Sequence, residues 1–379
     1  MTSRRILVVT VVHHPEDARI RHRQIASLLA AGWEVTFAAP WAGHGAQPPD
    51  DGTVPGLTAL DLTRSSGRRR FAAQRDARRV MREHGPRHDV VLLHDPELVP
   101  STLGISLPLT VWDVHEDTAA VVDLRSWVPA RLRGPLRSLA STMERSAERR
   151  MVLILADEDY AQRFAQPHLV VPNTTPVPPD PPPAGTPDEQ GRLRVVYLGS
   201  LTRERGVGEL VRVGEQLAAR TEGRAVLEIV GPAHGSATTE QLQAAQRAGH
   251  LEWSGFLPAD RALDRLDGAL AGLSLLHDVE NFRPSMPTKV VEYLAHAVPV
   301  ISTPLPRAVD LVDRSGAGTV VPFHDVEQTV EQLLAWVADP AAAAELGRRG
   351  HDLARRELDW GVHSAEFVTA MERLAGASR

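Results

Sequence analysis

Hydrophobic residues in this chain form short continuous runs, separated by longer segments in which apolar positions recur every three or four residues. The first run, Ile6–Val12, is followed by a segment of helical spacing and then by a second run at 34–39. This alternation predicts a strand–helix–strand unit. Further strands are predicted at 89–93, 109–113, 151–156 and 168–171. Because these runs are apolar throughout, they indicate a parallel sheet covered by helices on both faces.

A proline-rich segment at 172–191 interrupts the pattern. Proline removes backbone donors, so this segment is predicted to be neither a helix nor a central strand. The alternation then resumes, with strands predicted at 194–199, 225–231, 272–276, 298–302 and 318–322. A helix is predicted after Asp325, which acts as N-cap with Gln328 three residues later.

The pattern therefore predicts an α/β protein with two doubly wound parallel-sheet domains of the Rossmann-like type. Ligands of such folds bind at the carboxyl ends of the strands, so a cleft between the two sheets is the expected site. The predicted parts are an N-terminal domain, a linker, a second domain and a C-terminal helix, at 1–172, 173–192, 193–355 and 356–379.

Composition narrows the classes of function. The 379 residues are 42% hydrophobic and 24% charged with a net charge of −6, which excludes a disordered chain and nucleic-acid binding by bulk charge. The absence of cysteine excludes disulfides, cysteine-ligated metals and a thiol nucleophile. The apolar run near the N-terminus is too short for a signal peptide or a membrane span, so a cytoplasmic location is expected.

Lysine is almost absent from the chain. Of 42 basic residues only Lys289 is a lysine, and the others are arginine. Such a bias is typical of a GC-rich genome, which leaves lysine where arginine does not serve equally well. Lys289 is therefore a candidate functional residue, although chance can also leave a single lysine.

The loop after the strand at 194–199 has the composition of an anion site. Gly199 ends the strand, Arg203 and Arg205 follow, and Gly206 stands where a helix begins. Glycine allows close backbone approach, a helix N-terminus attracts an anion, and arginine can bind two phosphate oxygens. These features predict a diphosphate site. The alternative is an ordinary strand-to-helix turn with solvent-exposed arginines.

A second candidate lies on a helix that Pro287 and Thr288 can start. Lys289 and Glu292 are one turn apart on it, so that one charge can meet a phosphate and the other a ribose hydroxyl. The alternative is an intrahelical ion pair. Glu292 and His296 alone are too few ligands for a metal, and no metal site is predicted.

Two acidic–histidine turns in the first half form the third candidate. His94 and Asp95 follow one predicted strand, and His115 and Glu116 follow another. Their side chains are expected to point into the cleft. The alternative is that they cap helices and satisfy loop backbone.

Five motifs, in order, resemble a family 4 retaining glycosyltransferase of the GT-B fold. They are HHPEDARIRHRQIASLLAAGWEVT, HDPELVP, DVHED, YLGSLTRERG and NFRPSMPTKVVEYLAHAVPVIS. The resemblance extends over nearly the whole chain. The closing LDWGVHSAEFVTAMERL is similar to the last helix of such enzymes, which returns to the N-terminal domain.

The resemblance implies roles for individual residues. His115, Arg205 and Lys289 would be catalytic, with His115 on the transferred sugar and the two cations on the donor diphosphate. The implied donor-binding residues are Gly199, Ser200, Gly231, Pro232, Phe256, Leu257, Met286, Pro287, Thr288 and Glu292. The implied acceptor-side residues are Asp17, Arg19, His94, Asp95 and Glu116. Two positions depart from the family pattern: Ser200 replaces an arginine, and Pro284 replaces a glutamate that holds sugar hydroxyls.

The resemblance also implies an activity in the hexosyltransferase class. A sugar would pass from a nucleoside diphosphate, UDP in preference to GDP, to an acceptor hydroxyl with retention and without metal or cofactor. The acceptor would be a cell-surface polysaccharide, a glycolipid or a natural product. Two alternatives stay open: a nucleotide-sugar epimerase or hydrolase of the same fold, and a non-catalytic partner subunit, for which Ser200 and Pro284 argue.

The N-terminal domain, which the resemblance assigns to acceptor binding, carries a basic stretch. Residues 64–87 contain nine arginines and two acidic residues, and Leu132, Leu136, Leu139 and Met143 share one helical face beside three further arginines. Both stretches predict either peripheral contact with the inner membrane face, holding an anionic or lipid-linked acceptor, or simply solvated helix faces.

Overall fold

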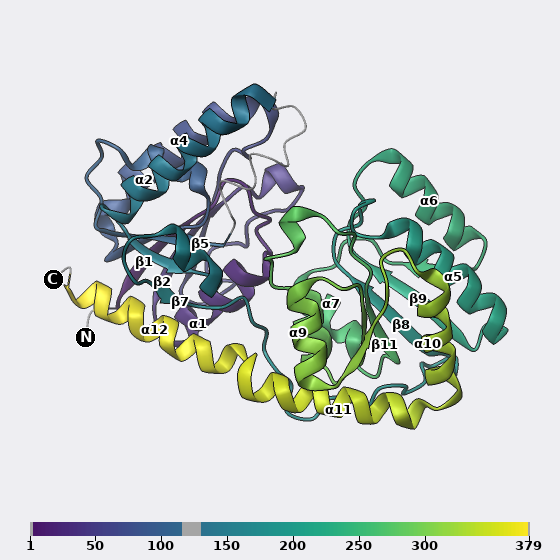
Figure 1. The fold of residues 1–379 in the computed structure, drawn as a ribbon. Helices are drawn as coiled ribbons and strands as arrows, with labels where there is room; N and C mark the ends of the chain where they lie inside the picture. Colours follow the sequence, from purple (N-terminus) through teal and green to yellow (C-terminus); the bar gives the residue numbers. More distant parts are fainter. Residues whose placement is uncertain (1–2, 116–129, 378–379) are drawn as a thin grey trace. The chain divides into compact units, whose positions relative to one another are not determined.

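The computed structural model describes residues 3–115 and 130–377. Its contacts divide the chain into two compact units (Figure 1): unit 1 comprises Met1–Asn173 with Val362–Arg379, and unit 2 comprises Thr174–Gly361. Both termini belong to unit 1, where Arg4 forms an ion pair with Glu372 of the last helix.

Unit 1 contains a seven-stranded parallel sheet in the order β3-β2-β1-β4-β5-β6-β7. The strands are β1 (Arg5–Val9), β2 (Glu34–Ala39), β3 (Leu57–Asp61), β4 (Val90–Leu93), β5 (Leu109–Val114), β6 (Val152–Leu155) and β7 (Leu169–Val170). The helices are a π-helix η1 (Ala18–Ile25), α1 (Ala26–Ala30), α2 (Arg70–His84), α4 (Ala130–Glu148) and the last helix, α12 (Trp360–Ala377). Short 3-10 turns are η2 (Ala42–His44), η3 (Gly67–Arg69), η4 (Gly85–Arg87), η5 (Pro96–Leu98), η6 (Pro100–Thr102) and η7 (Glu158–Arg163).

Unit 2 contains a six-stranded parallel sheet in the order β10-β9-β8-β11-β12-β13. The strands are β8 (Leu193–Leu198), β9 (Ala225–Val230), β10 (Leu251–Trp253), β11 (Ala271–Ser274), β12 (Val300–Ser302) and β13 (Gly318–Val320). The helices are α5 (Val207–Thr221), α6 (Ser236–Arg247), α7 (Ala259–Leu263), α8 (Thr288–Ala295), α9 (Pro306–Ser315), α10 (Val326–Ala338) and α11 (Pro340–Glu357), with 3-10 turns η8 (Asp264–Leu266) and η9 (Glu280–Phe282).

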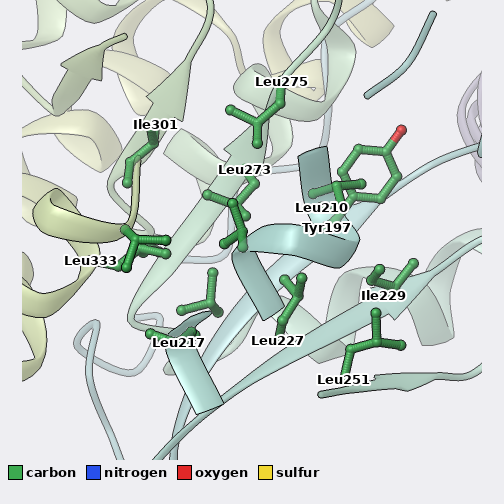
Figure 2. Packing of buried hydrophobic residues seen from close by; sticks show 14 of the residues in the cluster. Tyr197, Leu210, Leu217, Leu227, Ile229, Leu251, Leu273, Leu275, Ile301 and Leu333 are labelled. Atoms are coloured by element: carbon green, nitrogen blue, oxygen red, sulfur yellow. The ribbon is translucent and has the colours of Figure 1, made fainter. Parts of the chain in front are cut away.

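The continuous apolar runs give each strand two buried faces. In β8, Val195 and Tyr197 belong to one core cluster with α5 and α10, whereas Val196 and Leu198 belong to another with α8, α9 and α11. Figure 2 shows the first cluster, in which Leu210 of α5 packs among leucines of the sheet. Alternate residues point to opposite faces, so both faces must be covered, as the sequence predicts.

The sequence predicts two of the four edge strands, β7 and β13, but not the other two, β3 and β10. β3 reads Leu-Thr-Ala-Leu-Asp and is only partly buried, and β10 has three residues. An edge strand has a neighbour on one side only, so it needs no continuous apolar run. The predicted first strand also ends early, at Val9, because the backbone of Val11 donates to Asp95 (2.5 Å) instead of continuing the sheet.

The helix predicted after Asp325 is confirmed as α10, and the Asp325 carboxylate accepts from the backbone N–H of Gln328 at 2.9 Å. Residues 172–191 contain no helix and no strand of either sheet, and Thr175 makes one isolated bridge to Asp359. Within 3–115 and 130–377, no helix has the length and apolar character that crossing a membrane requires.

Candidate functional site

The candidate anion site of unit 2 lies at the carboxyl ends of β8 and β11. These neighbouring strands mark the point where the strand order of the sheet reverses, which is where ligands bind in doubly wound folds. Gly199 follows β8, and Leu275 and Leu276 follow β11. The loops after β8 and β11 therefore lie at the position where the fold class predicts a ligand site.

Two glycines hold the strand-end loops in direct contact. Gly231, at φ +146°, leaves so little room that a Cβ there would lie 2.0 Å from the carbonyl oxygen of Gly199. The Gly231 N–H donates to the carbonyl of Gly255 at 2.7 Å, and the Trp253 indole donates to the Gly231 carbonyl at 2.9 Å. A side chain at residue 231 would push the loop after β9 away from the loop after β8.

Gly206 fixes the start of α5 in a similar way. Its φ is +82°, and a Cβ would lie 2.2 Å from the carbonyl oxygen of Leu275. The loop between Ser200 and Gly206 is consequently pressed against the end of β11. The sequence predicts a glycine-bounded loop and a helix start here, and both are confirmed.

Lys289 lies in the first turn of α8, as predicted, and is buried. The residue is 7% exposed, and within residues 3–115 and 130–377 its ammonium has no hydrogen-bond partner. Nζ lies 3.9 Å from the centroid of the Tyr197 ring, a cation–π contact. Burial lowers the Lys289 pKa well below its ordinary value, the Arg205 charge lowers it further, and Glu292 opposes both.

Arg205 and Lys289 converge on Gly199. A Cβ on Gly199 would lie 3.8 Å from Nζ of Lys289 and 4.0 Å from Nη1 of Arg205. The Arg205 guanidinium also lies over the Phe282 ring, 5.7 Å from its centroid. Two cations thus stand beside one backbone turn, and no carboxylate forms a salt bridge with Lys289 among the described residues.

The two cations line a cavity of about 160 Å³, the cationic pocket. Its wall is completed by Ser274, Leu276, Phe282, Ser285, Met286, Pro287, Thr288, Leu305 and Ala308. The N-terminus of α8 lies at this wall, and the aligned peptide dipoles of the helix favour negative charge there. The arrangement is therefore suited to an anion bearing more than one oxygen.

The remaining predicted donor residues surround this region less closely. Ser200 accepts a hydrogen bond from the Tyr197 hydroxyl through its carbonyl (3.0 Å), and Phe256 is 48% exposed. Leu257 packs partly buried against the apolar cluster that includes α8. Pro232 and Glu292 are half-buried, and neither lines the cationic pocket.

Unit 1 carries a histidine–aspartate cluster made of His13, His94, Asp95, Asp113 and His115, at the carboxyl ends of β1, β4 and β5. Asp113 is its centre and is fully buried. Arg19 donates to both oxygens of Asp113, from Nε at 2.8 Å and Nη2 at 2.7 Å, and Gln24 donates at 2.9 Å. Burial alone would raise the pKa of Asp113, but Arg19 and the two histidines hold it well below its ordinary value.

The pKa values of the two histidines beside Asp113 shift in opposite directions. Nδ1 of His94 lies 3.3 Å and Nδ1 of His115 3.5 Å from the same carboxylate oxygen. Burial outweighs the carboxylate for His94 and lowers its pKa. For His115 burial also lowers the pKa, but Asp113 more than compensates and raises it above the ordinary value.

His13 is a member of the cluster that sequence reasoning missed. Its Nε2 lies 2.8 Å from Nε2 of His115 and 3.3 Å from an oxygen of Asp95. Two imidazole nitrogens at that distance must share one proton. His13 stands directly after a predicted strand, and the same position relative to a strand makes His94 and His115 candidates. Asp113 is the last residue of a predicted strand and carries no such signal.

The structure corrects the expectation that His94 and Asp95 point into a cleft. Each is 1% exposed, so neither reaches solvent. Asp95 instead accepts hydrogen bonds from the Thr10 hydroxyl (2.9 Å) and from the backbone of Val11, which makes it a support for the loop after β1. Glu116 lies outside the described residues.

Asp17 and Arg19, the other predicted acceptor-side residues, start η1. The Asp17 carboxylate accepts from the backbone N–H groups of Arg19 (2.9 Å) and Ile20 (3.0 Å), and it caps the helix. The structure brings Arg19, His94, Asp95 and His115 into one network in unit 1. In unit 2 it brings Arg205, Met286, Pro287, Thr288 and Lys289 into one pocket, with Gly199 beside its two cations.

Part of the chain resembles a known protein family. Residues 192–339 match the family model of glycosyl transferases group 1, and no curated protein matches the chain. The sucrose-phosphate synthase of Thermosynechococcus elongatus is similar in structure, with a TM-score of 0.70, 17% identity, and coverage of 99% of this chain and 100% of that one.

Two further solved structures are similar over nearly their whole length. WaaG, a glycosyltransferase of lipopolysaccharide biosynthesis, has a TM-score of 0.67 and 14% identity, covering 96% of this chain and 98% of its own. HepE of Anabaena, solved with UDP and glucose, has a TM-score of 0.64 and 12% identity, covering 98% and 100%. The fold is GT-B, and the family model and the fold together support a glycosyltransferase.

Proposed function

We propose that the chain is a family 4 retaining glycosyltransferase that moves a sugar from a nucleoside diphosphate to an acceptor hydroxyl. The observation that carries this proposal is the buried Lys289 ammonium, which has no hydrogen-bond partner among the described residues and lies with Arg205 beside the backbone of Gly199. Burying an unpaired cation destabilises the free protein. A diphosphate would supply the negative charge that this pocket lacks.

The pocket would act mainly on the leaving group. As the bond between sugar and diphosphate breaks, negative charge grows on the departing phosphate oxygen. Arg205, Lys289 and the N-terminus of α8 are already held in position by packing, so they stabilise this charge without reorganising. The proposal requires no metal for this step, since two cations serve the role.

His115 is proposed to contact the transferred sugar near the bond that breaks. Its carboxylate partner, Asp113, is fixed by two hydrogen bonds from Arg19 (2.8 and 2.7 Å), so the imidazole orientation is supported from behind. In the proposed retaining reaction the acceptor attacks on the face from which the diphosphate leaves. The leaving phosphate oxygen then takes the proton of the acceptor hydroxyl, and no protein base is needed.

UDP is the proposed nucleotide. The support is the HepE structure, which is described as a complex with UDP and glucose. Gly231, Pro232, Phe256 and Leu257 are proposed to border the base, because the hydrogen bond from Gly231 to Gly255 (2.7 Å) places their loops together.

The acceptor is proposed to be a polysaccharide, glycolipid or natural-product hydroxyl, with peripheral contact between the basic stretch 64–87 and anionic lipid. In support, Phe71 at the start of α2 is 79% exposed among arginines. Leu139 of α4 is also 64% exposed, although Met143, predicted on the same face, packs against the core of unit 1. The protein is proposed to act in the cytoplasm.

Calorimetric titration of UDP, GDP and dTDP into the wild type, Lys289→Ala and Arg203→Ala tests the donor site. Arg203 is an exposed arginine of the same loop and does not line the pocket, so it controls for bulk charge. The expected result is tight binding of UDP that is lost in Lys289→Ala and kept in Arg203→Ala. Binding of no nucleotide would reject the site and leave the partner-subunit alternative.

A second assay separates transfer from the competing enzyme class. An epimerase or hydrolase of nucleotide sugars turns over its donor with no acceptor present. A glycosyltransferase is expected to release UDP from UDP-glucose slowly alone and faster when acceptor hydroxyls are added. Rapid turnover that is independent of acceptor would therefore contradict the proposal.

A further inference from the structure

Unit 2 contains a second cluster of ligand-type side chains, outside the cationic pocket. Glu209 lies in the first turn of α5, His277 in the loop after β11, and His324 in the loop before α10. Nε2 of His277 lies 3.1 Å from one oxygen of Glu209, and Nδ1 of His324 lies 2.9 Å from the other. Three segments distant in sequence thus bring two imidazoles to one carboxylate.

The spacing fits a metal ion. One ligand atom from each of the three residues lies within 4.8 Å of the other two. Zinc bonds of about 2.0–2.1 Å in a tetrahedron place ligand atoms roughly 3.3–3.5 Å apart, so ligand atoms that lie within 4.8 Å of one another would have to approach by at most about 1.4 Å to hold the ion. Two imidazoles and a carboxylate also suit a divalent transition metal better than Mg²⁺ or Ca²⁺, which prefer oxygen ligands alone.

The exposure of the three side chains allows a metal to enter. Glu209 is 11% exposed, His277 19% and His324 55%, so the carboxylate is sheltered while one face of the cluster is open to water. A competing cation, Arg212, contacts Glu209 at 3.4 Å, but its side chain is 55% exposed and can turn away. Water can occupy the coordination positions that the protein leaves free.

The histidine–aspartate cluster of unit 1 contains a similar set of ligand atoms, but it is less suited to a metal ion. His94, Asp113 and His115 also bring ligand atoms within 4.8 Å of one another. There, however, Arg19 occupies both oxygens of Asp113 and is 5% exposed, so a cation would meet a fixed positive charge with no route for exchange. Glu209 has no such buried cation beside it among the described residues.

We infer that Glu209, His277 and His324 form a binding site for a divalent transition metal, Zn²⁺ being the probe. The role is structural, since none of the three residues lines the cationic pocket. The ion would connect the first turn of α5 with the loop after β11 and the loop before α10. Arg205 lies just before α5 and Leu276 lies in the loop after β11, and both line the cationic pocket. The inference does not depend on the proposed transfer reaction.

The backbone of His324 provides a variant that removes a ligand and keeps the fold. His324 has φ +65°, in the left-handed region that glycine adopts without strain. His324→Gly is therefore expected to fold at least as well as the wild type. His234→Ala, at an exposed histidine elsewhere in unit 2, controls for binding by surface imidazoles.

The test is titration of Zn²⁺ into tag-free, chelator-treated protein by calorimetry, with visible absorption of bound Co²⁺ as the second readout. Wild type and His234→Ala are expected to bind one more ion than His324→Gly and Glu209→Gln, or to bind it at least about tenfold more tightly. They are also expected to show the strong Co²⁺ bands of tetrahedral coordination. Equal Zn²⁺ binding by wild type and a folded His324→Gly would overturn the inference, as would binding of no ion by the wild type.

Discussion

Lys289→Met is expected to change stability and nucleotide binding in opposite directions. The side chain is 7% exposed, and its ammonium has no hydrogen-bond partner, so the charge is a cost to the free protein. Methionine has a similar length and no charge, and it can pack against the same ring of Tyr197. The variant should therefore be more stable than the wild type without ligand and bind UDP more weakly.

The magnitudes follow from the contacts. An unsatisfied buried polar group costs about 1–3 kcal/mol, and more when charged, while the cation–π contact with Tyr197 returns about 0.5–2 kcal/mol. The difference between these two terms is a net gain in unfolding free energy of about 1 kcal/mol on substitution. Loss of one charge-assisted bond to phosphate costs about 1.5–3 kcal/mol, which corresponds to roughly 10- to 150-fold weaker UDP binding.

The stability effect depends on pH in a defined direction. Because the folded pKa of Lys289 lies well below its ordinary value of 10.5, the unfolded chain binds more protons between these two values. The wild type without ligand should therefore gain stability as pH rises through that window. Below the folded pKa the full cost remains, and Lys289→Met removes this part of the pH dependence.

Differential scanning calorimetry with and without UDP provides the assay, because it measures the Tm of each protein in both states. A gain of 1 kcal/mol raises the Tm of a unit of this size by roughly 2–4 °C. The reasoning is refuted if Lys289→Met lowers the Tm without ligand, or if UDP raises the Tm of both proteins equally.

The other predictions concern single contacts. Gly231→Ala should lower the free energy of unfolding by more than about 3 kcal/mol, since its Cβ would lie 2.0 Å from the Gly199 carbonyl oxygen. Urea unfolding followed by tryptophan fluorescence measures this loss, and a variant as stable as the wild type would disprove the contact. Asp113→Asn should cost about 3–5 kcal/mol by leaving Arg19 buried and unpaired, and a Tm within 2 °C of wild type would contradict that. Asp325→Ala should lower the free energy of unfolding by about 1 kcal/mol, because α10 loses its N-cap. The control Arg203→Ala, at an exposed residue, should leave this free energy unchanged. His115, with its raised pKa, should stabilise unit 1 below pH 6.5 and less as pH rises through the folded pKa, a slope that calorimetry should find flattened in His115→Gln.

The fold could be predicted from sequence because its signals are local. The apolar runs of the central strands and the capping residue of α10 act through neighbours a few positions away. The edge strands β3 and β10 could not be predicted in this way, since half-exposed strands need no continuous apolar run. Nor could the early end of β1, which depends on Asp95, more than 80 residues away.

The residues of the candidate site also differ in whether the local sequence predicts them. The loop from Gly199 to Gly206 and the Lys289 helix carry local signals, namely glycines at a strand end and a proline at a helix start. His13 and Asp113 carry almost none, because one stands next to a motif and the other ends an apolar run. Their importance comes from a 2.8 Å contact and a buried carboxylate that only the folded sheet assembles.

The sequence by itself thus determined the two parallel sheets and the residue types available to bind an anion, because strand and helix periodicity is written in consecutive positions. Tertiary structure alone decided which of those residues meet and which are buried. It turned Asp95 from an expected ligand contact into a support for β1, left the Lys289 ammonium without a partner, and joined Glu209 to two histidines. Charges act through space, and spatial neighbours follow from the topology of the sheet rather than from adjacency in the chain.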